Sequence, residues 1–211
     1  MSFAQATQVH AAAGIAIVDD PTDLDCFLEP HCAAAIWRRQ MPAEVQTWLA
    51  DVDPDRLPRG KVVLRPHAVA QTLEYLCDIS DLPTGAECDW LQADILSMSL
   101  MVADLLDAQY VRMRLGVVTT NACRKFHVDA LSARLVCTYR GSGTQYGIAR
   151  DGEDPTRVFS VQAGAPILLR GELWPERPAS GLVHRSPPIE GTGETRLVLV
   201  LDPVFDLKGE A

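Results

Sequence analysis

The chain of 211 residues has few cysteines, and they form no recognisable pattern. The six thiols include no CxxC pair and no dense framework, which indicates reduced cysteines in a cytosol. Long apolar runs are also missing: residues 95–103, an uncharged and strongly apolar run, have about half the length of a membrane-spanning helix. Residues 3–18 lack the positive flank of a signal peptide, because the first basic residue is Arg38. We therefore expect a cytoplasmic protein without a membrane partner.

Basic residues are scarce, with 19 Lys and Arg against 28 Asp and Glu, which gives a net charge of -9. An acidic surface repels phosphate backbones, so we expect no nucleic-acid partner. Hydrophobic residues make up 47% and charged residues 22% of the chain, a balance that supports a folded core and excludes disorder, collagen and coiled coil. The length fits a single domain over residues 1–211. The remaining partner class is a small-molecule or peptide substrate, whose identity the sequence does not reveal.

Several common catalytic motifs are absent from the sequence. It contains no Walker loop, no GxGxxG after a strand, no HExxH and no GxSxG. The glycine-rich stretch 140–144 precedes no helix whose dipole would attract a phosphate, so we interpret it as a hairpin turn.

Hydrophobic patterning divides the chain near residue 110. Before that point we expect a mainly helical portion (1–109), with helices at 43–50, after Pro66, and at 89–107 with Asp89 as its N-cap. After it we expect short antiparallel strands at 110–119, 131–139, 157–161, 165–169 and 196–201. Such strands favour an antiparallel sandwich or barrel over a parallel sheet. The predicted fold class is α+β, and its simplest architecture packs the helical portion on an antiparallel β-barrel formed by residues 110–204.

The β portion carries one constellation with metal-binding chemistry. His127 and Asp129 are two residues apart, so in an extended segment their side chains share a face. His184 follows 57 residues after His127, far enough for antiparallel strands to bring it back beside the pair. Two imidazoles and one carboxylate form a facial set of metal ligands with open positions. Arg196, on an otherwise apolar strand, needs an anionic partner, and a bidentate carboxylate suits it.

Other interpretations of these residues remain open at this stage. His127 and Asp129 could form a simple hydrogen-bonded pair, His184 could lie in a polar turn, and Arg196 could pair with Asp202 or Glu194. Cys123, four residues before His127, is a candidate additional ligand, and a thiolate in the set would favour zinc. Its alternative role is that of a small buried or loop thiol. The remaining histidines, His10, His31 and His67, are expected to be surface or capping groups.

The pattern HxD…H followed by an arginine resembles the double-stranded β-helix of the iron(II)/2-oxoglutarate oxygenases, a cupin-like or jelly-roll fold. The resemblance covers residues 110–204. It implies that His127, Asp129 and His184 bind Fe(II) and that Arg196 binds the distal carboxylate of 2-oxoglutarate.

A second resemblance spans most of the chain. The segments FHVD at 126–129, CTYRGxGT at 137–144 and HRSP at 184–187 are similar to the bacterial DUF1826 family. That family is a domain of unknown function, so the resemblance implies no activity.

Three functions follow from the sequence. The first is a mononuclear non-haem dioxygenase that uses Fe(II) and 2-oxoglutarate on an unknown substrate. The second is a cupin-like zinc protein with the same ligands and a metal-handling or hydrolytic role. The third is a non-catalytic structural or interaction domain.

Overall fold

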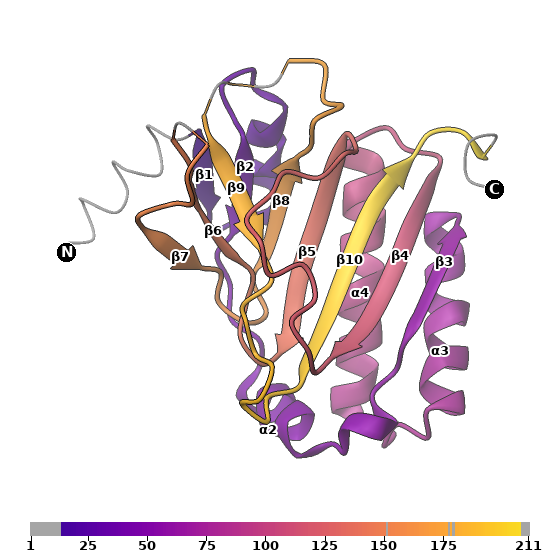
Figure 1. Ribbon diagram of the computed structural model, residues 1–211. Coiled ribbons are helices and arrows are strands. Elements are labelled where there is room, and N and C mark those ends of the chain that lie inside the picture. Colours follow the sequence, from indigo (N-terminus) through magenta and orange to yellow (C-terminus); the bar gives the residue numbers. More distant parts are fainter. Residues whose placement is uncertain (1–13, 151, 177, 179, 208–211) are drawn as a thin grey trace.

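The computed structural model describes residues 14–150, 152–176, 178 and 180–207, and these residues form three layers. Helices lie behind a large sheet of seven strands, and a small sheet of three strands lies in front of it (Figure 1). The strands are β1 Ile15–Val18, β2 Ala34–Trp37, β3 Gly60–Leu64, β4 Tyr110–Val118, β5 Ala133–Arg140, β6 Gln145–Ile148, β7 Val158–Ser160, β8 Pro166–Arg170, β9 Leu182–Arg185 and β10 Arg196–Val204. The α-helices are α2 Ala43–Asp51, α3 Val69–Ile79 and α4 Ala86–Leu105, and the 3-10 helices are η1 Pro21–Leu28, η2 Pro54–Arg56 and η3 Pro66–Ala68.

The strands after residue 110 are distributed over the two sheets. The large sheet has the order β1-β2-β8-β5-β10-β4-β3 and the small sheet the order β7-β6-β9. All pairings among these later strands are antiparallel. This is the winding of a jelly roll, in which two sheets face each other. The α+β class is therefore confirmed, and among the described residues the two sheets are not joined into one closed barrel.

The N-terminal half is less helical than expected. It contributes β1, β2 and β3 to the large sheet, with β1 parallel to β2, β2 antiparallel to β8, and β3 antiparallel to β4. Each of these strands has only four or five residues. Runs this short show neither helical nor strand periodicity clearly, which explains why the sequence did not reveal them.

The long helix α4 covers the large sheet from behind (Figure 1). Its apolar side chains repeat along one face, and this face is buried, with Leu91, Ile95, Met98 and Val102 each at most 1% exposed. The helix begins after Gly85, where the sequence had suggested Asp89 as the N-cap. The Asp89 amide instead donates to the Gly85 carbonyl, so Asp89 already lies inside the helix and places its negative charge in the first turn.

Core residues pack against both faces of the large sheet along β10. Along β10, Leu197, Leu199 and Leu201 belong to the core cluster on the helix side. Val198 and Val200 belong to the second cluster, which fills the space between the two sheets. Because side chains alternate along a strand, every even-numbered residue of β10 from Arg196 to Asp202 faces this inter-sheet space.

The glycine-rich stretch 140–144 connects the sheets and is not a hairpin turn. It leads from β5 in the large sheet to β6 in the small one, and these strands do not pair. Gly141 has a φ of +81°, and a Cβ on Gly143 would lie 1.8 Å from the Val161 carbonyl oxygen. The turn needs glycine at both positions because of this conformation and this close approach.

The sequence predicted neither a disulfide framework nor a membrane-spanning segment. All six cysteines are free thiols, in agreement with the sequence analysis. In the part of the chain that the structure describes, no helix combines the length and apolarity needed to cross a bilayer.

Candidate metal centre

Backbone hydrogen bonds bring His127 and His184 together. The His127 amide donates to the His184 carbonyl and the His184 amide donates to the His127 carbonyl, both at 3.0 Å. This single antiparallel bridge places the segment around His127 beside β9, at the edge of the small sheet. Direct backbone pairing thus brings these two residues together although they are far apart in sequence, as predicted.

The three predicted ligands form one compact group. One ligand atom from each of His127, Asp129 and His184 lies within 4.8 Å of the others. The imidazole centroids are 4.5 Å apart. Asp129 Oδ1 lies 3.6 Å from His127 Nε2, and Asp129 Oδ2 lies 3.1 Å from His184 Nε2. The structure therefore confirms the juxtaposition of the two imidazoles and the carboxylate.

The hydrogen bonding of His127 leaves one ring nitrogen available to a metal. Its Nδ1 lies 2.9 Å from the Lys125 carbonyl oxygen, which can only accept, so Nδ1 carries the proton and donates it. In the neutral ring Nε2 then holds a lone pair that points toward Asp129. Metal-ligating histidines commonly show this arrangement.

The carboxylate of Asp129 has one oxygen engaged and one oxygen free. Oδ1 accepts a hydrogen bond from Arg134 Nη1 at 2.6 Å. Oδ2 is buried and accepts no hydrogen bond of acceptable geometry in spite of its nearness to His184. A buried carboxylate oxygen without a donor is costly, and a metal ion would satisfy it.

Asp129 is negatively charged although it is half-buried. Burial disfavours its ionisation, but the imidazoles of His127 and His184 and the Arg134 guanidinium outweigh that effect and hold the pKa well below the ordinary range. The Asp129 carboxylate in turn raises the pKa of His127, against the effect of burial. Before a metal binds, Asp129 is thus an anion ready to act as a ligand.

Arg134 is a site residue that the sequence analysis missed. It donates to Asp129 through Nη1 and to both oxygens of Asp202 through Nε and Nη2, at 2.7 and 2.8 Å. Asp202 lies on β10, so Arg134 ties the metal ligand to the large sheet. The available signal was an arginine near the start of a strand that continues Leu-Val-Cys, where a buried guanidinium needs anionic partners.

Arg196 is a buried cation at the start of β10. Its exposed fraction is 1%, and it donates to the Ser142 carbonyl at 2.6 Å and to the Thr138 hydroxyl at 3.1 Å. Neither expected alternative is formed: Asp202 pairs with Arg134, and Glu194 accepts from the amide and hydroxyl of Ser142. Among the described residues no carboxylate forms an ion pair with Arg196. Burial lowers its pKa to about 10, so an anion beside it would stabilise its charged form.

Arg196 and His184 open onto the same inter-sheet space. Arg196 is two residues from Val198 on the large sheet, so their side chains point to the same face. In the same way His184 shares a face of the small sheet with Leu182. Val198 and Leu182 both belong to the cluster between the sheets. The ligand group and the buried guanidinium are therefore placed around one interior.

The remaining candidates lie outside this group. Cys123 is exposed, and its thiol is not part of the three-residue cluster. The described residues therefore give no four-ligand set with a thiolate. His31 and His67 are exposed, in line with surface roles, whereas His10 lies outside the described residues.

The donor set fits a divalent metal with open coordination positions. Two imidazoles and one carboxylate on one side are the arrangement found in non-haem iron(II) oxygenases. The unpaired Asp129 Oδ2 and the available His127 Nε2 show that these particular atoms are ready to bind.

Comparison with known proteins supports the fold. A family model described as "Protein of unknown function (DUF1826)" matches residues 18–202. No curated protein matches the chain. Among solved structures, it is similar to dioxygenase for auxin oxidation 1 from Arabidopsis thaliana in complex with 2-oxoglutarate, with a TM-score of 0.52, 12% identity, and coverage of 91% of this chain and 93% of that one. The dioxygenase for auxin oxidation of rice gives a TM-score of 0.52 and 13% identity over 90% of this chain and 83% of that one. At this identity the likeness concerns the fold.

Proposed function

The chain belongs to the DUF1826 family, whose description gives no activity, and we propose from its own side chains that it is an Fe(II)- and 2-oxoglutarate-dependent oxygenase. One observation carries the proposal. A group of two imidazoles and one carboxylate shares an interior with a buried arginine that has no carboxylate partner among the described residues. The fold shared with two dioxygenases for auxin oxidation is consistent with it.

In this proposal His127, Asp129 and His184 hold the metal. They approach from one side, because all three come from the segment around residue 127 and its neighbour β9. The opposite side then stays open to further ligands. Bound iron(II) and 2-oxoglutarate would together supply the means to activate oxygen for the oxidation of a substrate.

Arg196 binds the distal carboxylate of 2-oxoglutarate in this proposal. Its charge is buried at the start of β10, where water does not screen it, so a carboxylate there would gain a strong charge-assisted hydrogen bond. The Thr138 hydroxyl, which accepts from Arg196, has a proton of its own to donate to the same carboxylate. The chain's contribution is thus to orient the cosubstrate and to exclude water around it.

The test is an anaerobic titration with iron(II) and 2-oxoglutarate, followed by absorption spectroscopy. We expect a weak metal-to-ligand charge-transfer band from wild-type protein. Arg196→Leu should weaken 2-oxoglutarate binding at least tenfold and leave metal binding unchanged. Arg157→Leu, which removes an exposed arginine of the same charge, should behave like wild type.

Two results would overturn the proposal. One is the absence of any 2-oxoglutarate-dependent band in protein that holds iron, and the other is equal cosubstrate affinity in wild type and Arg196→Leu. Circular dichroism would establish that the variant is folded. Arg196→Lys, which keeps the charge but loses the bidentate fork, should retain part of the affinity and thereby separate binding from folding.

A further inference from the structure

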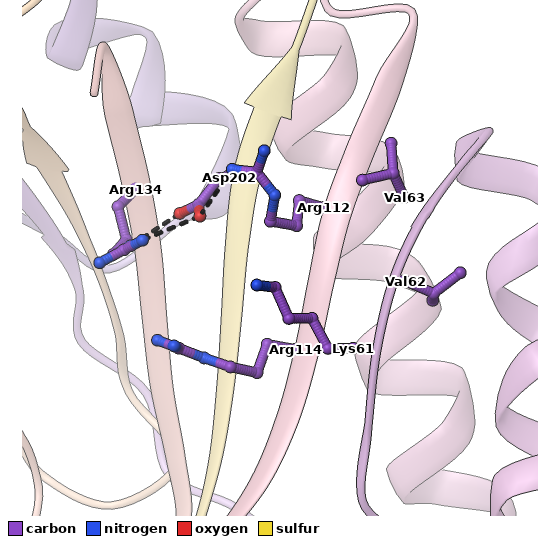
Figure 2. Close-up of a pocket in the computed structure, with 7 residues that line it drawn as sticks. All are labelled: Lys61, Val62, Val63, Arg112, Arg114, Arg134 and Asp202. Atoms are coloured by element: carbon purple, nitrogen blue, oxygen red, sulfur yellow. Dashed lines mark hydrogen bonds and ion pairs between the residues drawn. The ribbon is translucent and has the colours of Figure 1, made fainter. Parts of the chain in front are cut away.

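A basic pocket lies on the large sheet beside the metal centre (Figure 2). It has a volume of about 330 Å³. Its lining consists of Lys61, Val62, Val63, Arg112, Arg114, Arg134 and Asp202. Four cations and one carboxylate therefore meet at one hollow of a chain whose net charge is -9. This concentration is opposite to the charge of the whole molecule.

Two of these cations face each other across neighbouring strands. Lys61 on β3 is the direct antiparallel partner of Arg114 on β4. Like charges in this position destabilise a sheet. Figure 2 shows the Lys61 side chain and the longer Arg114 side chain reaching from their strands across the sheet toward β5. Neither residue forms an ion pair with a described residue, so their mutual repulsion is not relieved there.

The one carboxylate in the pocket is already engaged. Each carboxylate oxygen of Asp202 accepts a hydrogen bond from Arg134, and Asp202 Oδ2 also lies 3.7 Å from Arg112 Nη1. It therefore neutralises the part of the pocket nearest the metal centre. An additional anion would have to come from outside the chain to neutralise Lys61 and Arg114.

Arg134 connects the pocket to the metal ligands directly. The same guanidinium that lines the pocket donates to Asp129 at 2.6 Å. Across the sheet, Arg114 pairs with Val200, which belongs to the inter-sheet cluster. If Lys61 and Arg114 hold the anionic group of a small molecule, the rest of that molecule would lie beside the metal.

We propose that this pocket binds the carboxylate or phosphate group of a small anionic substrate. That the bound anion is a substrate rests on the proposed oxygenase function, whereas anion binding by Lys61 and Arg114 does not. The competing occupant with the same chemistry is 2-oxoglutarate itself. We assign the cosubstrate to Arg196, because that arginine is buried in the interior, while Lys61 and Arg114 are exposed.

The first experiment titrates metal-free protein with inorganic phosphate and with succinate, followed by amide chemical shifts in nuclear magnetic resonance. We expect saturable binding of at least one of the two anions. Lys61→Met combined with Arg114→Met should weaken it at least tenfold. The matched control, Arg59→Met with Arg157→Met, removes two exposed arginines elsewhere and should change the affinity less than twofold. Because no metal is present, this result is independent of the oxygenase proposal.

A second measurement separates the two sources of carboxylate. With iron present, the Lys61→Met/Arg114→Met protein should bind 2-oxoglutarate as wild type does, whereas Arg196→Leu should not. Loss of 2-oxoglutarate binding in the double variant would make the pocket a cosubstrate site and overturn the proposal. Absence of saturable phosphate and succinate binding, or equal losses in the control, would also overturn it. The double variant should fold, because it removes a repulsive pair, and thermal unfolding would verify this.

Discussion

At the scale of single residues, the orientation of Asp129 depends on Arg134. The guanidinium holds Asp129 Oδ1 and is itself fixed by two hydrogen bonds to Asp202, which leaves Oδ2 for a metal. Groups that orient a ligand in this way contribute strongly to metal affinity, and their loss typically costs about 10- to 100-fold. Removing Arg134 alone would also leave the buried Asp202 carboxylate with only its longer contact to Arg112, at 3.7 Å, so both partners are changed together.

We therefore predict that Arg134→Met combined with Asp202→Asn lowers cobalt(II) affinity by about 10- to 100-fold, measured by competition with a chelator. Asp202→Asn alone leaves the hydrogen bond from Arg134 to Asp129 in place and serves as the control, with a much smaller loss. Equal affinities in the double variant and the control would show that Arg134 does not orient the ligand.

The three ligands could be predicted from the sequence because their spacing is enough to place their side chains together. His127 and Asp129 share a face in any extended segment, and antiparallel winding returns His184 to them. Arg134 could not be assigned in the same way. Its role depends on Asp202, which is distant in sequence and which the sequence offered equally as a partner of Arg196.

At the scale of elements, the turn between β5 and β6 is fixed by close backbone contact. A Cβ at position 143 would lie 1.8 Å from the carbonyl oxygen of Val161, and backbone atoms cannot move aside as a flexible side chain does. Gly116, within β4, has its nearest such atom at 3.9 Å, an ordinary contact. The two glycines therefore form a matched pair of sites for alanine.

We predict that Gly143→Ala lowers the free energy of unfolding by about 2 kcal/mol or more, as overpacking of a well-packed site does. Gly116→Ala should change it by less than about 1 kcal/mol, because the added methyl group has room and strand backbone tolerates alanine. Urea denaturation followed by fluorescence would measure both values. A Gly143→Ala protein as stable as wild type would contradict the described turn.

The elements differed in how well the sequence predicted them. Helix α4 was recognisable because its apolar stripe repeats over several turns, and the long strands β4 and β10 were recognisable because they are rich in branched residues. Strands β6 and β9 have four residues each, too few for a periodic signal, although β9 carries His184. Their existence follows from pairing with each other, which is a tertiary property.

At the scale of the whole molecule, the two-sheet arrangement creates the site. Strand β9 of the small sheet and the segment bridged to it present the two histidines, and the large sheet presents Arg196 and the basic pocket. A core cluster fills the space between the sheets. The sequence predicted the antiparallel C-terminal portion but not the three N-terminal strands that widen the large sheet. One of these, β3, supplies Lys61 to the pocket, so the missed strands bear on function as well as on architecture.

The most direct test of this account is the metal content of the folded protein. After anaerobic incubation with iron(II) and desalting, elemental analysis should find about one equivalent in wild type. His184→Ala should fall to background because two ligands cannot hold the ion, while His67→Ala, which removes an exposed histidine, should keep the wild-type amount. If the wild-type protein retains no metal, or if His184→Ala retains as much as wild type, the group around His127 is not a metal centre.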